Sequence, residues 1–478
     1  MNALEVIHDD IQTRFAKMTG RFDRFFMQWI KFNDNSERLF GARGFNNENY
    51  LQSRLAENNV DAAAAVFDAV LVHWKEKGQD GNIFAFLNHE DYDGNGIWHY
   101  LADTLRQHEG ASTLKIARTL LAMDIDFSRR NKNGQSPLFK MLVPTPRWQS
   151  LNALIQTKHL SIENIERAVA EGTPEEAERN HVMSMIFSRD IAENRGLLSQ
   201  HVLRQAVQPQ ADVTLRAATC RLFFEYFDVE TGGTAFFDLI GIANHAMFDD
   251  LMRLLMTNTA EMVRKIGAPD TATAKSYAQA YLAQKLLRRK KNGQGVLFVA
   301  LFAQKHMHMR KITSLLHNDE LVIKKIVRGD TVRKEMVIDK TSPAPTNPLL
   351  SMLLQQDLDG NTVFHHATMQ GDLQALKWLF SGLAPNDIHA IILSVPNKLG
   401  LSLIELTQLE TVKAHLTQAV MQKRMRPEQA IAYLRALPGE NADVAGFLTS
   451  KVNEIEELAK SVGRKEPLPP TFQIRKAP

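Results

Sequence analysis

The residues best suited to chemistry by type and spacing lie between Asp91 and Gly96. The stretch Asp-Tyr-Asp-Gly-Asn-Gly places side-chain oxygens at alternate positions, as the first half of a calcium-binding loop does. Such a loop also needs a bidentate Glu at its twelfth position, where this chain has Ala102. The pattern Asp-x-Asp-Gly-Asn recurs at 357–361, so we interpret it as a repeated turn and expect no metal ion there.

Cys220 is the single cysteine and therefore the one candidate for a thiol nucleophile. It lies in an apolar stretch that is predicted to be helical, where a free cysteine usually behaves as a small buried side chain. A thiol nucleophile would also need a nearby base, and the sequence places none of these histidines beside it: His201, His245, His306, His308, His365 and His366.

Motifs of common enzyme classes give no further support for catalysis. The chain has no Walker A loop, no dinucleotide-binding G-x-G-x-x-G, no H-E-x-x-H and no G-x-S-x-G. We therefore expect no cofactor and favour a non-enzymatic protein. A cysteine-protease-like enzyme, with its active site in the non-repeat helices, is the alternative.

The composition is that of a folded chain with several domains or one long repeat array. It has 478 residues, 44% of them hydrophobic and 23% charged. One cysteine cannot form an intramolecular disulfide, and no run of about 18 apolar residues is present that could span a membrane. Residues 1–10 are acidic where a signal peptide would be basic, so we expect no secretory signal and, without another export route, a cytoplasmic protein.

The clearest structural signature lies at 357–380. Asp-Leu-Asp-Gly-Asn-Thr predicts a turn, and Val363, Phe364 and Ala367 mark the inner face of a short helix. A break at Gly371 precedes a second apolar-faced helix. This arrangement resembles an ankyrin repeat, whose pattern D-G-x-T-P-L-H-x-A matches 359–367 except at Val363 and Phe364.

Weaker copies of this unit begin at 91, 132, 232, 291 and 397, and a degenerate one begins at 194. The resemblance implies a mostly all-α fold, an ankyrin-type helical repeat solenoid of about six uneven repeats. It also implies that His99 and His365 are structural, because the repeat's histidine normally bonds to the neighbouring turn. His306 and His308 have a spacing that suits metal binding in a strand, whereas this region is predicted to be helical.

These observations predict seven segments. They are a helical N-terminal region or cap at 1–90, ankyrin repeats at 91–160, a helical region with a degenerate repeat at 161–230, ankyrin-like repeats with a helical insert at 231–321, a basic β-hairpin and Pro-rich linker at 322–350, ankyrin repeats at 351–420, and C-terminal helices with a flexible tail at 421–478. Because a Pro-rich linker precedes it, the repeat at 357 is expected to open a second block.

Basic residues are concentrated between Lys285 and Lys334, where 13 Lys and Arg face 3 Asp and Glu. This region predicts an acidic protein partner. A nucleic acid or ribonucleoprotein is the alternative, although no nucleic-acid-binding motif accompanies the charge. One run is a candidate nuclear-import signal: Arg288, Arg289, Lys290 and Lys291.

The acidic cluster at 454–458, followed by a basic end that contains proline, resembles the C-terminal translocation signal of effectors secreted by type IV systems of Legionella-like intracellular bacteria. Together with degenerate ankyrin repeats, this resemblance implies a virulence effector. Such a protein would act in the host cytoplasm or nucleus, in a host–pathogen interaction.

Taken together, the two resemblances imply a non-catalytic scaffold that binds a host protein through its hairpin tips and its concave helix face. The expected contact residues at the tips are Tyr92, Asn95, Arg130, Lys132, Lys291 and Leu358. The basic hairpin is expected to add Lys324, Lys325, Arg328, Arg333 and Lys334.

Overall fold

The computed structural model describes residues 43–61, 63–64, 67–68, 71, 80–107, 110–155, 160–173, 175–242, 245–267, 269–317, 347–437, 442–461, 467 and 469–471. In these ranges the regular structure is helical, apart from two isolated antiparallel bridges, Phe227–Thr234 and Arg289–Gly295. The predicted all-α class is confirmed. The predicted β-hairpin at 322–338 lies outside the described residues, as do the first 42 residues of the predicted cap.

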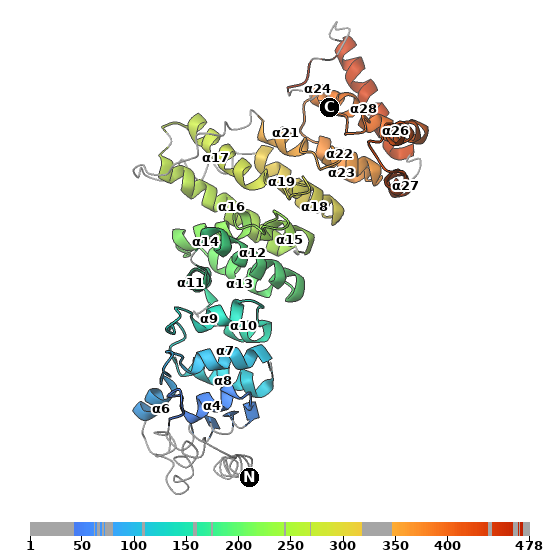
Figure 1. The fold of residues 1–478 in the computed structure, drawn as a ribbon. Helices are drawn as coiled ribbons and strands as arrows, with labels where there is room; N and C mark the ends of the chain where they lie inside the picture. The colour runs from blue at the N-terminus through green and yellow to red at the C-terminus, as the bar shows by residue number, and fades with distance from the viewer. Residues whose placement is uncertain are drawn as a thin grey trace. The chain divides into compact units, whose positions relative to one another are not determined.

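The chain divides into two compact units, residues 1–208 and 209–478, and each is described by itself. In the first unit the helices follow one another in chain order (Figure 1). They are α4 (Tyr50–Ala56), α6 (Asp80–Leu87), α7 (Ile97–Gln107), α8 (Ala111–Ala122), α9 (Pro137–Leu142), α10 (Trp148–Leu154), α11 (Ile162–Gly172), α12 (Glu176–Glu193) and α13 (Leu197–Ala206).

The second unit has one long helix in its first half and another near its C-terminal end (Figure 1). Its helices are α14 (Val213–Phe224), α15 (Ala235–Ile242), α16 (His245–Ile266), α17 (Thr271–Leu286), α18 (Val296–Phe302), α19 (His306–His317), α21 (Pro348–Leu353), α22 (Val363–Met369), α23 (Leu373–Phe380), α24 (Pro385–Ser394), α25 (Leu403–Leu406), α26 (Leu409–Met421), α27 (Pro427–Ala436) and α28 (Ala442–Ser461).

Local sequence explains where many of these helices begin. Ser136 caps α9 by accepting the Phe139 N–H, and Pro137 occupies the first helical position, where its missing N–H costs nothing. Thr362 caps α22, where His365 completes a capping box. The two helices predicted on either side of Gly371 are present as α22 and α23.

Within each unit, the helix that directly follows one turn packs against the helices that directly follow the preceding and the next turn. In the first unit α7 packs against both α4 and α9. In the second unit α18 packs against α15 and α22, and α22 also packs against α25. The apolar face predicted for 363–367 forms this contact, since Val363, Phe364 and Ala367 are all fully buried.

The row of helices in the second unit continues across the point where we predicted that a new block opens. Helix α19 packs against both α21 and α23, and α18 packs against α22. The backbone N–H of Leu358 donates to the carbonyl of Asn292 at 3.1 Å. The prediction of a separate block at 357 was therefore wrong, because the elements on either side of residues 318–346 stack directly on each other.

The predicted degenerate repeat start at 194 is instead a sharp break between α12 and α13. Arg195 and Gly196 have positive φ angles. The buried carboxylate of Asp190 then accepts the backbone N–H groups of Leu198 and Ser199 at the start of α13. Asp190 thus caps a helix, and its charge is favourable at that N-terminus.

The C-terminal tail, which we predicted to be flexible from 463, is bound where the structure describes it. Both the backbone N–H and the hydroxyl of Thr471 donate to the carboxylate of Asp387, at 2.7 and 2.8 Å. The side chain of Asn386 donates to the carbonyl of Pro469. Residues 469–471 therefore lie against the first turn of α24.

Candidate functional site

Seven turns in the described residues share one backbone pattern, and we call them tip turns. The N–H of the first residue donates to the carbonyl of the fifth, and the N–H of the fourth donates to the carbonyl of the first. The turn at Asp228–Gly233 follows the same pattern with one extra residue. The tip turns are 44–48, 91–95 and 131–135 in the first unit, and 228–233, 290–294, 357–361 and 397–401 in the second.

The last residue but one of each of these turns has a positive φ angle, which explains the recurring glycine. In two turns the glycine is also needed for close approach to the next turn. A Cβ on Gly360 would lie 2.7 Å from the backbone nitrogen of Lys398, and one on Gly293 would lie 2.8 Å from the Cα of Asp357. The turn at 44–48 uses Asn47 for this position, at φ 63°.

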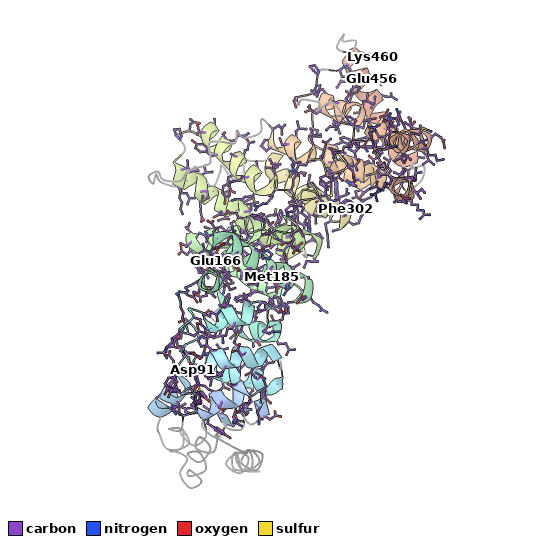
Figure 2. All side chains as sticks on the ribbon, viewed as in Figure 1. Asp91, Glu166, Met185, Phe302, Glu456 and Lys460 are labelled. Carbon is purple, nitrogen blue, oxygen red and sulfur yellow. The ribbon has the colours of Figure 1, made fainter. Side chains whose placement is uncertain are left out.

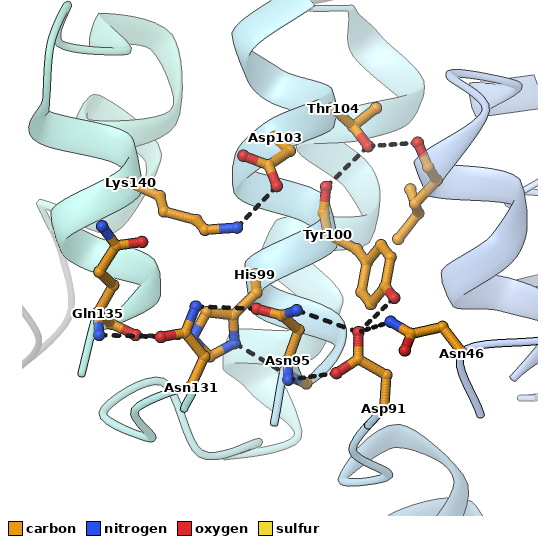
Figure 3. Close-up of polar contacts among 12 residues, drawn as sticks. Asn46, Asp91, Asn95, His99, Tyr100, Asp103, Thr104, Asn131, Gln135 and Lys140 are labelled. Carbon is orange, nitrogen blue, oxygen red and sulfur yellow. Dashed lines mark hydrogen bonds and ion pairs between the residues drawn. The ribbon is translucent and has the colours of Figure 1, made fainter. Parts of the chain in front are cut away.

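A side-chain oxygen of the first residue holds several of these turns closed. One oxygen of Asp91 accepts the N–H groups of Asp93 and Asn95, both at 2.8 Å. Its other oxygen accepts the hydroxyl of Tyr100 at 2.6 Å and the side-chain amides of Asn95 and Asn46 (Figure 3). Both oxygens therefore have protein donors, in keeping with the interpretation of the calcium-like pattern as a turn.

The same arrangement recurs at 357, 131 and 397. Asp357 accepts the N–H groups of the residues two and four positions later, and Asn131 and Asn397 do the same through their amide oxygens. Side-chain hydrogen bonds of this kind preset the backbone of a turn. These side-chain hydrogen bonds hold the four turns closed.

Within each unit, every tip turn after the first is also hydrogen-bonded to the preceding one. The amide of Asn131 donates to the side-chain oxygen of Asn95 at 3.1 Å, as Figure 3 shows. The backbone N–H of Lys132 donates to the carbonyl of Asp93 at 2.8 Å. The second residue of a turn makes this backbone contact at every junction within a unit: Tyr92 to Asn46, Lys132 to Asp93, Lys291 to Thr231, Leu358 to Asn292 and Lys398 to Asp359.

His99 and His365 contact the neighbouring turn, as predicted. The Nδ1 of His99 accepts the N–H of Gly96, and its Nε2 donates to the carbonyl of Gln135 at 3.0 Å. His365 repeats this geometry with Thr362 and Leu401. This arrangement suits a neutral imidazole, and burial lowers the pKa of His99 and lowers that of His365 to about 4.

The residue that follows this histidine differs between the units. In the first unit Tyr100 donates its hydroxyl to Asp91, and in the second unit the Nε2 of His366 contacts Asp357 at the same register, also at 2.6 Å. Burial opposes ionisation of Asp357, but the hydrogen bonds from His366 and the turn backbone outweigh it. The pKa of this carboxyl is therefore lowered.

The second residue of every tip turn is exposed, and we call it the tip residue. Four tip residues are apolar: Phe45 is 89% exposed, Tyr92 61%, Val229 49% and Leu358 61%. The other three are the exposed lysines Lys132, Lys291 and Lys398. The sequence analysis missed Phe45 and Val229, although both could have been found by aligning Gly-Phe-Asn-Asn and Asp-Val-Glu-Thr with the Asp-Tyr-Asp-Gly turn.

Four of the predicted contact residues are tip residues, and two are placed differently. Asn95 is partly buried in the hydrogen-bonded ladder between turns, so it is unsuited to partner contact. Arg130 is exposed but forms an ion pair with Glu171 at 2.7 Å. The predicted hairpin residues lie outside the described residues: Lys324, Lys325, Arg328, Arg333 and Lys334.

The basic run at 288–291 is not a set of four free cations. The guanidinium of Arg288 lies 4.4 Å from the ring centroid of Phe227 and donates to the carbonyl of Glu225. Lys290 lies over the ring of Phe237. Only Arg289 and Lys291 are exposed, because the extended backbone at this turn points alternate side chains in opposite directions.

Cys220 belongs to α14 of the second unit and is buried there, near side chains of α16 and α17. Burial raises the pKa of its thiol well above the usual range. The groups that act on this thiol are Lys285, Glu225, Glu261 and Asn258, and no histidine is among them. Asn258 itself donates to the hydroxyl of Tyr281. This environment suits a structural cysteine rather than a nucleophile.

The described residues contain neither a membrane-spanning helix nor a metal-ligand cluster. Across the described ranges, no helix combines the length and apolar character needed to cross a bilayer. No three His, Cys, Asp or Glu side chains in those ranges converge as metal ligands. A comparison of the chain with protein-family models found no match, and no curated protein matches it.

Proposed function

We propose that this chain is a non-catalytic protein-binding scaffold, built as an ankyrin-type array of helical repeats. The repeated tip turns, the histidine that contacts the next turn and the stacked helices support the architecture. The observation that carries the function is the exposure of apolar side chains on rigid tips. Phe45, Tyr92, Val229 and Leu358 occupy the same position in four turns, and each is about half exposed or more.

Large apolar residues are unexpected at the second position of a tight turn, where Asn, Asp, Ser and Pro prevail. Aromatic side chains at rigid exposed positions are the residues that most often dominate binding energy at interfaces. Hydrogen bonds already fix the backbone of both turns, so the entropic cost of ordering Phe45 and Tyr92 on binding a partner would be small. The tips therefore suit a protein partner.

This function can be tested by replacing apolar tip residues in the full chain. The variant Phe45→Ser/Tyr92→Ser/Leu358→Ser should lose the proteins that the wild-type chain retains from a host-cell lysate. A matched control is Met421→Ser/Ile431→Ser/Leu458→Ser, whose residues are similarly exposed but lie away from the tips. Equal retention by all three proteins would show that the tips do not mediate binding.

For the biological setting, we propose a bacterial effector that a type IV system delivers into a host cell. The support is the acidic cluster at 454–458 and the basic, proline-containing end that follows it. The cluster lies in α28, where Glu456 is 3.6 Å from His389. A translocation reporter fused to the chain should lose delivery on Glu456→Ala/Glu457→Ala substitution. Delivery that is equal with and without the substitutions would contradict the proposal.

A further inference from the structure

The second unit presents four consecutive tip residues in one hydrogen-bonded row. They are Val229, Lys291, Leu358 and Lys398, and backbone bonds of 2.8, 3.1 and 3.0 Å join the successive turns. All four side chains are exposed, so the row alternates between apolar and basic groups. We call these four residues the tip row.

The tip row carries a different charge from the four residues that directly follow its members in the sequence. Neither Lys291 nor Lys398 forms an ion pair with a described residue, and the exposed Arg289 adds positive charge near Lys291. The next residue in each turn is acidic, polar or apolar: Glu230, Asn292, Asp359 and Leu399. A ligand displaced by one residue across the turns would place its apolar groups against Glu230 and Asp359 and its carboxylates against the uncharged Asn292 and Leu399, which favours one placement over the tip row.

The spacing of the turns determines which ligand can contact all four tip residues. Each turn contributes two passes of chain, and neighbouring passes in a hydrogen-bonded layer are about 4.8 Å apart, which gives roughly 10 Å per turn. Helices pack at a similar interval of about 8–10 Å. An extended peptide in the polyproline II conformation advances about 3.1 Å per residue and completes a turn every three residues, so every third residue, about 9 Å further on, would face a new tip residue.

We propose that the tip row binds an extended acidic segment of a protein partner, in which apolar and acidic side chains alternate at every third residue. The apolar side chains contact Val229 and Leu358, and the carboxylates pair with Lys291 and Lys398. This inference rests on the proposed function and specifies the chemistry of its partner. A nucleic-acid backbone carries a negative charge at every residue, so it would also bring phosphates beside the apolar tips and the carboxylates of Glu230 and Asp359, which argues against it.

Two synthetic peptides of identical composition test whether apolar and acidic residues must alternate at every third position to match the tip row. The first is Leu-Ser-Thr-Glu-Ser-Thr-Leu-Ser-Thr-Glu, and the second has both Leu at positions 1 and 4 and both Glu at positions 7 and 10. Fluorescence anisotropy with the full chain should show binding of the first peptide at least tenfold tighter, about 1.4 kcal/mol. Equal affinities, or no binding of either peptide, would overturn the proposal.

Charge reversal in the chain provides the complementary test. Lys291→Glu/Lys398→Glu should weaken the first peptide at least tenfold and should strengthen a version with Lys in place of Glu. Lys377→Glu, at an exposed lysine of α23, is the matched control and should change neither affinity. Tighter binding of single-stranded RNA than of the peptide, lost in the double variant, would overturn the proposal in favour of nucleic acid.

The outcomes separate this inference from the function on which it rests. If the apolar tip variant loses its lysate partners while neither peptide binds, the scaffold function stands and the acidic extended ligand is wrong. If the peptides bind in register but the tip variant retains every lysate partner, the tip row binds peptides without explaining the main interactions. Far-UV circular dichroism of each variant verifies that it is folded.

Discussion

The side-chain amide of Asn397 donates a hydrogen bond to the side-chain oxygen of Asn361, at 2.9 Å. Asn131 makes the same contact with Asn95 at 3.1 Å, in the other compact unit. In both cases the donor is the first residue of a tip turn and the acceptor is the fifth residue of the preceding turn. Neighbouring tips are thus joined through side chains as well as through the backbone.

Asn397 both closes its own turn and contacts the preceding turn, and substitutions at this position should separate the two contributions. Asn397→Ala removes the acceptor for the N–H groups of Leu399 and Leu401 as well as the bond to Asn361, so unfolding should become easier by about 2 kcal/mol. Asn397→Asp keeps the acceptor and loses only the donor, so it should cost about 1 kcal/mol. Urea unfolding measures both. An Asp variant as unstable as the Ala variant would show that the turn bonds contribute little.

Gly360 and Gly400 form a matched pair with similar backbone geometry, at φ 75° and 83°. Each Gly→Ala substitution should cost about 1–2 kcal/mol for the left-handed conformation alone. At Gly360 the new methyl would also meet the backbone of Lys398, whereas nothing lies within 4 Å at Gly400. Gly360→Ala should therefore be clearly the more destabilising in urea unfolding. Equal losses would mean that the turns separate easily.

Much of the fold could be predicted because its signals are local. Apolar periodicity located the two helices between 363 and 380, and the Asp-x-Asp-Gly-Asn pattern located the turns at 91 and 357. The turn at 44–48 was missed because Asn47 takes the left-handed position that glycine takes elsewhere. The prediction of a repeat at 194 was wrong for the converse reason. Gly196 has a positive φ angle, but it lies in the break between α12 and α13 and not in a tip turn.

The site was less predictable because it depends on contacts between distant residues. Spacing alone could not show that Arg288 packs on Phe227, or that Glu171 pairs with Arg130. The docking of Thr471 on Asp387 joins residues 84 positions apart and leaves no local pattern. The exposure of Tyr92 and Leu358 was predictable, since turn position alone decides it.

Cys220 should be unreactive in the folded protein. Its burial and its raised thiol pKa predict that a thiol reagent such as 5,5′-dithiobis(2-nitrobenzoic acid) labels it only as fast as the second unit opens. Cys220→Ala should cost about 1 kcal/mol of stability and leave every biological effect intact. Loss of a host phenotype with fold and partner binding unchanged would instead support a cysteine enzyme.

The contact between Thr471 and Asp387 should stabilise the C-terminal end of the second unit. Thr471→Val removes the hydroxyl donor but keeps the backbone N–H, and Asp387 is almost fully buried. We expect a loss of about 1 kcal/mol and faster hydrogen exchange in the first turns of α24. Unchanged exchange there would show that the docked tail contributes nothing to that helix.

His365 should make the second unit less stable in acid. Its side chain is fully buried, and burial lowers its pKa to about 4 from an ordinary value near 6.5. Below pH 6.5 the unfolded chain binds a proton that the folded chain does not bind until about pH 4, so stability falls through this window, by roughly 3 kcal/mol in total. His365→Asn cannot titrate, and its unfolding free energy should fall less between pH 7 and pH 4.5. Parallel curves for the two proteins in urea unfolding would contradict this assignment.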